Sequence, residues 1–183
     1  MPKIIIALTG KIASGKEETK KHLINKYNAQ GVAFSGMLRD VLQRINVPIE
    51  RKNLQTLSTI LRNNFGEDLL ARNIVEDAKK MESEIVVMDG VRRLIDISYA
   101  KKFDGFVLVS IDADVNLRYE RMKNRNQNVG DDKKSLQDFL KDHESEADKE
   151  LPVVMAEATE HLDNNGSLDD LHKQIDALVS KYL

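Results

Sequence analysis

The sequence predicts an α/β fold in which helices cover both faces of a parallel sheet. Short runs that are apolar except for Ser110, at 4–8, 85–88 and 106–111, are typical of strands that are buried on both faces. These runs alternate with longer segments of helical periodicity, and such alternation gives parallel strands joined by crossover helices. Gly10 closely follows the first run, and a second glycine and a helix-forming segment come after it. Strand, glycine-bounded loop and helix in this order are typical of the class.

The composition fits one globular domain over residues 1–183. Apolar residues make up 41% and charged residues 32% of the chain, which is the balance of a domain with a sizeable core. The net charge of −2 gives no general attraction to nucleic acid or anionic membranes. No apolar run approaches the roughly 20 residues that span a bilayer, and the N-terminus lacks a signal-peptide pattern. The absence of cysteine excludes disulfides, thiol catalysis and thiolate metal sites. We therefore expect a cytoplasmic monomer or homodimer without nucleic-acid or membrane partners.

Glycine, serine and proline divide the first half of the chain into elements. Ser35 is a candidate N-cap for a helix that ends before Pro48, because proline breaks helices. Gly66 is a suitable C-cap between two further helices. The expected helices cover 17–27, 35–45, 50–65 and 67–81, and the second strand covers 32–34.

The second half is more polar, and its assignments depend on fewer apolar positions. Ser167 followed by Asp170 resembles a capping box, with Asp in place of the usual Glu. We expect helices over 114–128, 135–149 and 168–183, a polar connection over 126–134, and a last strand over 158–162. Residues 152–160 are too few to classify by periodicity.

A phosphate-binding loop is predicted between the first strand and the first helix. Gly10, Gly15 and Lys16 have the spacing of the motif GxxxxGK[ST], in which glycines let successive backbone amides point inward. The helix N-terminus and the lysine add positive charge for the phosphates. A tight turn with an incidental lysine is the alternative, but all three residues occur at the required spacing directly after a strand. The predicted nucleotide-binding residues are Gly10, Lys11, Ile12, Ala13, Ser14, Gly15, Lys16, Glu17 and Glu18.

A second candidate cluster follows the buried run 85–88. Asp89 stands at the carboxyl end of this predicted strand, where open α/β sheets bind their ligands. A carboxylate there is placed to hold Mg²⁺, which prefers oxygen ligands. Gly90, Arg92 and Arg93 follow, and the arginines offer countercharge to a phosphate-bearing substrate. The alternative is that Asp89 only caps the next helix.

Arginines on three predicted helices are candidate anion ligands. Arg39 lies in the first turn or so of its helix, near the carboxyl edge of the presumed sheet. Arg118, Arg121 and Arg125 fall on one helix face, and three guanidinium groups on one face suit a polyphosphate. A solvated or salt-bridged surface position is the alternative for each of these residues. For Arg62, spacing does not distinguish a ligand contact from a surface ion pair.

These motifs together resemble the P-loop nucleotide kinases of the nucleoside monophosphate kinase and dephospho-CoA kinase branch. The likeness is carried by Met37-Leu38-Arg39, by Asp89-Gly90 with Arg92, by Arg62 before Gly66, and by Asn165-Gly166. It extends over nearly the whole chain, and it is greatest for an archaeal family of adenylate-kinase-like or dephospho-CoA-kinase-like proteins.

The resemblance implies a three-layer α/β/α sandwich with a five-stranded parallel sheet in the order 2-3-1-4-5. It also implies a core over 1–34, 84–117 and 158–183, a helical substrate-binding region over 35–82 and a lid over 118–150. ATP and Mg²⁺ are the implied cofactors, with a small nucleotide as the acceptor.

The implied roles fall into three groups. The catalytic residues are Lys16, Asp89, Arg121 and Arg125, and the metal ligands are Glu17 and Asp89. Asn165, Gly166 and Arg121 join the loop residues in binding the nucleotide. The acceptor is bound by Ser35, Arg39, Arg62, Gly90, Arg92 and Arg93.

Three positions depart from the family pattern. Glu17 replaces the hydroxyl residue that usually ligates Mg²⁺, although a carboxylate can also ligate the metal or hold its water. Gly36 stands where an acid often precedes the substrate-side helix. Lys141 and its neighbours follow Phe139 where lid arginines are expected. These departures bear on the efficiency of the reaction.

The resulting hypothesis is transfer of the γ-phosphoryl group of ATP·Mg²⁺ to a nucleotide-type acceptor, first of all a (deoxy)nucleoside monophosphate. One alternative is transfer to a ribose hydroxyl, as in dephospho-CoA kinases. An alternative of another class is a nucleotide-binding sensor or weak ATPase that phosphorylates no acceptor. The sequence identifies neither the acceptor nor the preference between ATP and GTP.

Overall fold

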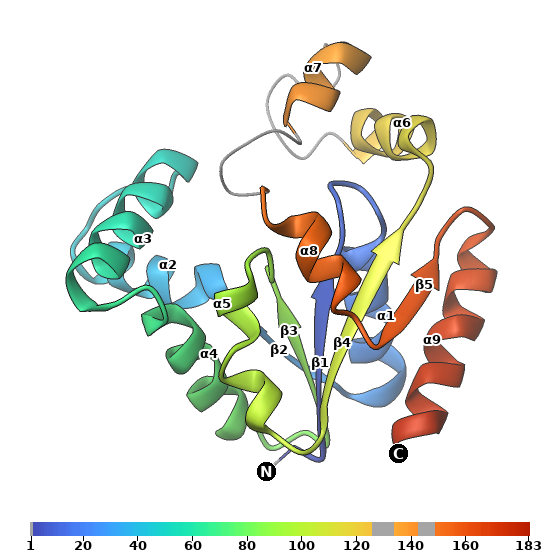
Figure 1. Cartoon of the computed structure of the whole chain (residues 1–183), viewed down its shortest axis with the longest axis horizontal. Coiled ribbons are helices and arrows are strands. Elements are labelled where there is room, and N and C mark those ends of the chain that lie inside the picture. Colours follow the sequence, from blue (N-terminus) through green and yellow to red (C-terminus); the bar gives the residue numbers. More distant parts are fainter. Residues whose placement is uncertain (1, 126–133, 143–148) are drawn as a thin grey trace.

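The computed structural model of this chain describes residues 2–125, 134–142 and 149–183 (Figure 1). Its centre is a sheet of five strands in the order β2-β3-β1-β4-β5, and every neighbouring pair is parallel. The strands are β1 (Ile4–Thr9), β2 (Gln30–Ala33), β3 (Ile85–Asp89), β4 (Phe106–Asp112) and β5 (Glu160–Asp163). The predicted fold class and strand order are therefore confirmed.

The helices surround this sheet and extend beyond its carboxyl edge. They are α1 (Lys16–Tyr27), α2 (Phe34–Arg44), α3 (Arg51–Phe65), α4 (Leu69–Lys79), α5 (Leu94–Ile97), α6 (Val115–Arg125), α7 (Leu136–Asp142), α8 (Leu151–Ala156) and α9 (Leu168–Tyr182), with a 3₁₀ helix η1 (Ala100–Lys102). In Figure 1, α5 and α8 lie in front of the sheet and α1 behind it. Helices α6 and α7 lie beyond the carboxyl ends of the strands, and both chain termini lie at the opposite end.

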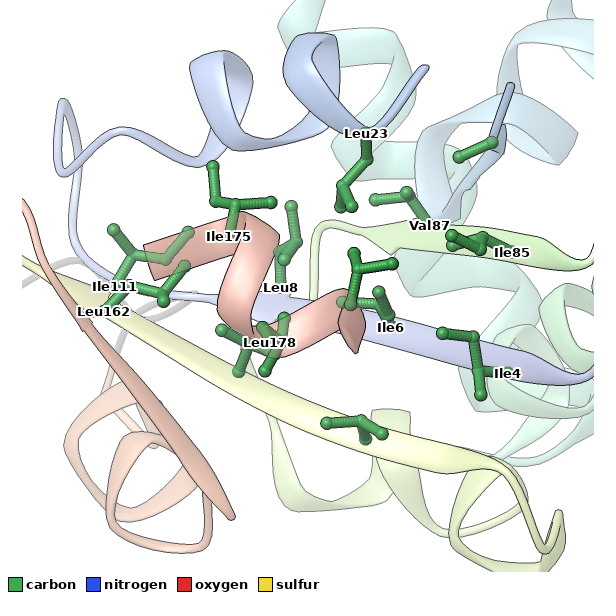
Figure 2. Packing of buried hydrophobic residues seen from close by; sticks show 14 of the residues in the cluster. Ile4, Ile6, Leu8, Leu23, Ile85, Val87, Ile111, Leu162, Ile175 and Leu178 are labelled. Atoms are coloured by element: carbon green, nitrogen blue, oxygen red, sulfur yellow. The ribbon is translucent and has the colours of Figure 1, made fainter. Parts of the chain in front are cut away.

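Two apolar layers, one on each face of the sheet, hold the helices in place. Alternate residues of β1 enter different layers, because successive side chains of a strand point to opposite faces. Ile4, Ile6 and Leu8 pack with α1 and α9 (Figure 2), whereas Ile5 and Ala7 pack with residues of α4, α5 and α8. This double burial explains why the strand is continuously apolar rather than alternating.

The element boundaries differ from the predictions mainly where turns are short. The second strand begins at Gln30, and α2 follows at Phe34 with Ala33 as its N-cap, so the prediction of Ser35 as the cap is wrong. The strand reaches the helix without an intervening loop, which leaves no position for a capping side chain after Ala33. Gly66 is confirmed as the C-cap of α3, with φ of 106°. Ser167 and Asp170 form the predicted capping box of α9.

The C-terminal third corrects two further predictions. The last strand is β5, two residues later than expected, and the unassigned stretch before it contains α8. In place of the long helix predicted over 135–149, the structure describes α7 alone, and residues 143–148 and 126–133 lie outside the described part of the chain. None of the described helices combines the length and apolar character needed to cross a bilayer.

Candidate active site

The loop between β1 and α1 has the backbone conformation that its glycines require. Gly10 has φ of 147° and Gly15 has φ of 120°, values that residues with a Cβ rarely adopt. A Cβ on Gly10 would overlap the carbonyl oxygen of Ile111, and a Cβ on Gly15 would overlap the side chain of Asn164. Both glycines are therefore needed for two reasons: they adopt the positive φ of the loop, and they let Ile111 and Asn164 come close to its backbone. The Nζ of Lys16 donates to the carbonyl oxygens of Gly10 (2.6 Å) and Lys11 (3.0 Å), which holds the ammonium group against the loop.

The loop borders a hollow of about 840 Å³ at the carboxyl edge of the sheet. Residues 12–18 of the loop and the start of α1 form one side of this hollow. Asp89 and Arg92, which follow β3, and Arg121 from α6 line it as well. Four of the predicted functional positions, Lys16, Asp89, Arg92 and Arg121, thus meet in one place although they come from three separate parts of the sequence.

Acidic side chains line the same hollow and supply oxygen ligands. Glu17 follows the loop lysine and is exposed, while Asp89 is half-buried with its Oδ2 3.8 Å from the Nζ of Lys20. Among the described residues, no three His, Asp or Glu side chains form a group that could bind a metal unaided. Mg²⁺ is usually bound by one or two carboxylates together with phosphate oxygens of the substrate, so this donor set fits Mg²⁺ delivered with a nucleotide.

Two arginines connect helix α6 with the loop and with the turn after β5. Arg118 is buried, and its Nε donates to Ala113 (3.0 Å) while its Nη1 donates to the carbonyl of Ile12 (3.3 Å). Arg121, one turn later, donates from Nη2 to Oδ1 of Asn164 (3.4 Å). Its Nη1 is buried and finds no hydrogen-bond partner among the described residues. Burial lowers the pKa of both guanidinium groups, although they remain charged at neutral pH because arginine titrates so far above it.

Two of the arginines predicted to bind the acceptor are engaged in ion pairs outside the hollow. The Nη2 of Arg62 lies 3.3 Å from Oδ1 of Asp96, which is buried. Oδ2 of the same carboxylate accepts from the backbone amides of Arg92 (3.1 Å) and Arg93 (3.0 Å). The Arg93 guanidinium pairs with Glu67 (3.0 Å) and Glu150 (3.6 Å). Arg62 and Arg93 thus bind protein carboxylates in this conformation, and their predicted role stays a prediction.

Of the other acceptor candidates, Ser35 and Gly90 lie near the amino-terminal end of α2, and Arg39 lies in the middle of this helix. Arg39 is exposed on α2 and forms no ion pair within the described parts of the chain, whereas Ser35 is half-buried in the first turn. Gly90 has φ of 93°, and a Cβ there would touch Phe34 at 3.7 Å. None of these three residues lines the hollow.

The turn after β5 places its residues differently from the prediction. Asn164, rather than Asn165 or Gly166, lines the hollow beside the loop. Asn165 lines a separate hollow of about 530 Å³ next to β5, where Ser110 Oγ and His161 Nδ1 lie 2.6 Å apart. Arg125 ends α6, and its side chain lies outside the described residues.

Sequence reasoning missed two residues at this site. Asn164 is buried, and its Nδ2 donates to the carbonyl of Ser14 across 2.7 Å. Lys20, one turn after the loop lysine, approaches Asp89. The i, i+4 spacing of Lys16 and Lys20 could have indicated that both lie on one helix face. No sequence signal separates Asn164 from the polar residues around it.

The chain is similar in sequence to curated proteins called UPF0200. One from Methanosarcina mazei is 29% identical over 185 residues, which cover 98% of this chain and 95% of the relative. Another from Thermococcus onnurineus is 26% identical and covers 98% of both chains. No family model matches the chain. The similarity extends over almost the full length, in agreement with the extent of the resemblance predicted from the motifs.

Solved structures of similar fold include small P-loop kinases. The structure of TT1252 from Thermus thermophilus has a TM-score of 0.62 at 17% identity, and the alignment covers 99% of this chain and 98% of that one. Shikimate kinase from Bacteroides thetaiotaomicron has a TM-score of 0.59 at 14% identity, with 97% of each chain covered. A gluconokinase from Sinorhizobium meliloti has a TM-score of 0.55 at 11% identity, and the alignment covers 98% of this chain and 93% of that one. The TM-scores establish a common fold, and the nucleoside monophosphate kinase branch stays a prediction.

Proposed function

We propose that this protein is an ATP-dependent phosphotransferase that acts on a small nucleotide-type acceptor. The observation that carries the proposal is the meeting of Lys16, Asp89, Arg92 and Arg121 around one hollow beside a glycine-bounded loop. Phosphoryl transfer demands positioning and charge neutralisation more than covalent catalysis, and this arrangement offers both. The similarity in fold to shikimate kinase and gluconokinase supports the same reaction class.

The transfer breaks the bond between the γ-phosphorus and the oxygen that bridges to the β-phosphate. A new bond forms between that phosphorus and an acceptor oxygen, and ADP leaves. Lys16 and the loop amides would bind the β- and γ-phosphates, with the Lys16 ammonium turning from the carbonyls of Gly10 and Lys11 towards phosphate oxygens. Arg121 would neutralise charge on the transferring group, since its buried Nη1 has a vacant donor within the described structure.

Glu17 and Asp89 would hold Mg²⁺ together with the phosphates, and the metal would supply further charge neutralisation. Lys20 lies close enough to Asp89 to fix the position of its carboxylate. On the acceptor side, Arg92 lines the hollow and Arg39 is exposed on α2, and we propose both as ligands of an anionic acceptor.

An acceptor screen tests the proposal. ADP release is measured with nucleoside monophosphates, deoxynucleoside monophosphates and dephospho-CoA, with ATP and with GTP as donors. Lys16→Ala should lower acceptor-dependent turnover about 100-fold or more, because a preorganised charge at the phosphates is lost. Lys79→Ala is the matched control, since Lys79 is an exposed lysine of α4 that pairs with Glu76. Near-normal turnover in Lys16→Ala would refute the mechanism. ATP binding without acceptor-stimulated turnover in the wild type would favour a nucleotide sensor instead.

A hydroxyl group is the second candidate acceptor. Arg62 and Arg93 bind protein carboxylates, which leaves fewer cations for an acceptor phosphate. The neighbours in fold are named for shikimate and gluconate, which carry hydroxyl groups. Asp89, which lines the hollow, would then accept the hydroxyl proton. Turnover with dephospho-CoA or with hydroxylated acids, but with no monophosphate, would select this candidate.

A further inference from the structure

Asn164 joins two parts of the site that are far apart in the sequence. Its side chain is buried, and Nδ2 donates to the carbonyl oxygen of Ser14 in the glycine-bounded loop. Oδ1 of the same amide accepts from Nη2 of Arg121 on α6 at 3.4 Å. The backbone amide of Asn164 donates to Asp112 at 2.9 Å, which fixes the residue to the end of β4. The side chain of Asn164 thus connects the loop with the helix that begins the predicted lid, and its backbone amide connects the residue with the sheet.

The chemistry of the amide suits this double contact. A carbonyl on one side requires a donor and a guanidinium on the other requires an acceptor, and a primary amide presents both in one plane. Aspartate has the same shape but no donor for the Ser14 carbonyl. Gly15 completes the arrangement, because any Cβ at that position would occupy the space of the Asn164 amide.

One end of the Arg121 guanidinium is hydrogen-bonded, and the other end has no partner within the part of the chain that the structure describes. Nη2 contacts Asn164, while the buried Nη1 has no partner among the described residues. An unpaired buried donor is costly, so an anion that enters the hollow gains a strong hydrogen bond there. The direction of this donor depends on the contact that Asn164 makes at the other side of the guanidinium.

We propose that Asn164 is a positioning residue that couples α6 to the glycine-bounded loop and holds Arg121 for the terminal phosphate of a nucleoside triphosphate. The inference rests on the proposed phosphoryl transfer, in which Arg121 contacts the transferring group and Asn164 acts through it. The family resemblance implied that the neighbouring Asn165 binds the nucleotide, whereas the residue that contacts the loop and Arg121 is Asn164.

A double-mutant cycle with Asn164→Ala and Arg121→Ala tests the coupling. Calorimetry measures binding of Mg²⁺·AMP-PNP, which keeps a terminal phosphate, and of Mg²⁺·ADP, which lacks it. Each single variant should weaken AMP-PNP binding about 10-fold and ADP binding less than about 3-fold, since one charge-assisted contact is lost. The double variant should bind AMP-PNP no more weakly than Arg121→Ala alone. In turnover assays, Asn164→Ala should lower kcat about 100-fold with a smaller change in KM for ATP, because misplacement of a catalytic group costs rate.

Two further variants separate positioning from general loss of structure. Asn116→Ala is the matched control, because Asn116 is an exposed asparagine of α6 away from the hollow, and it should behave as wild type. Asn164→Asp keeps the shape of the side chain but removes its donor to Ser14. It should lose kcat while its melting temperature stays closer to that of the wild type than Asn164→Ala does.

The outcomes distinguish this inference from the proposed function. Additive effects in the cycle, or equal losses for AMP-PNP and ADP, would overturn the positioning role even if the wild type transfers phosphate. Coupling in the binding cycle without any acceptor turnover would support the positioning role and overturn the transferase. A wild-type protein that binds neither nucleotide would overturn both. If Asn165→Ala, and not Asn164→Ala, reduced AMP-PNP binding, the assignment to Asn164 would be wrong.

Discussion

Arg62 of α3 and Asp96 of α5 form an ion pair, with Nη2 and Oδ1 3.3 Å apart, between the helical region and the turn after β3. Asp96 is buried and also accepts from the amides of Arg92 and Arg93, so one carboxylate shapes the turn that carries Arg92 into the hollow. Glu67 and Glu150 extend this contact through Arg93 to the segment that precedes α8. Ion pairs therefore connect the proposed acceptor side of the site to α3 and to the start of α8.

We predict that Asp96→Asn destabilises the fold by about 3 kcal/mol, because it removes the charge of a buried carboxylate that pairs with the partly buried guanidinium of Arg62. Asp96 accepts from the Arg62 guanidinium and from two backbone amides with its two oxygens, whereas asparagine has only one oxygen to accept from all three. The free energy of unfolding is measured by urea denaturation. Glu67→Gln is the control: Glu67 is an exposed member of the same network, and its loss should cost less than about 1 kcal/mol. If both variants lost the same free energy of unfolding, the pair of Arg62 and Asp96 would contribute no more than an exposed ion pair.

A second prediction concerns the space at Gly15. Gly15→Ala should abolish nucleotide binding and lower the melting temperature, since the new Cβ meets the Asn164 amide and the backbone has φ of 120°. Gly36→Ala offers a matched comparison, because Gly36 lies within α2 and a Cβ added there would meet no atom within 4 Å. That variant should gain up to about 1 kcal/mol from helix propensity. Calorimetric titration and thermal melting measure both effects. Retained nucleotide binding in Gly15→Ala would refute the geometric requirement.

The sequence predicted the sheet and one side of the site because both leave local signals. Strands buried on both faces are continuously apolar, and the loop motif has fixed spacing between its glycines and lysine. The placement of Asp89 followed from its position after such a strand, since the carboxyl ends of parallel strands share one edge. The strand order itself came from the family resemblance and not from periodicity.

The features of the site that the sequence did not predict are contacts between segments that are distant in the chain. Asn164 and Ser14 are 150 positions apart, and only the fold shows that they touch. The sequence did not distinguish a ligand contact from an ion pair for Arg62, and it did not identify the carboxylates that pair with Arg62 and Arg93. These partners are Asp96, Glu67 and Glu150, which approach through the packing of α3 and α8. Net charge on a helix face is visible in a sequence, whereas the pairing of each charge is not.

Acid should weaken the contact between α1 and α9. Asp176 accepts from His22, Lys26 and Tyr27, each at 2.7 Å, and the hydrogen bond with His22, followed by that with Lys26, lowers the pKa of this carboxyl below its usual range. Because the pKa is lower in the folded state, the unfolded state binds more protons in acid. The stabilisation is complete above the ordinary aspartate pKa of about 3.9 and is lost as the pH falls below it.

Asp176→Asn should therefore be less stable than the wild type by about 1 kcal/mol at pH 7, with the gap closing below about pH 4. Urea denaturation at a series of pH values measures the difference. Asp104→Asn serves as the control, because Asp104 is exposed in the turn before β4, and its difference from the wild type should stay small at every pH. A gap for Asp176→Asn that is constant from pH 7 to pH 3 would contradict the linkage.

The start of α9 depends on a cap that the sequence predicted. Ser167 Oγ accepts from the amide of Asp170, and the Asp170 carboxylate accepts from the amide of Ser167, which satisfies two amides that a helix otherwise leaves unpaired. Ser167→Ala should lower the free energy of unfolding by about 1 kcal/mol, because the first of these bonds is lost. Ser180→Ala near the other end of the same helix should be nearly neutral, since alanine is the better helix former there. Denaturation gives the global cost, and amide hydrogen exchange in the first turn of α9 locates it. If Ser167→Ala raised exchange no more than Ser180→Ala, the cap would contribute nothing to this helix.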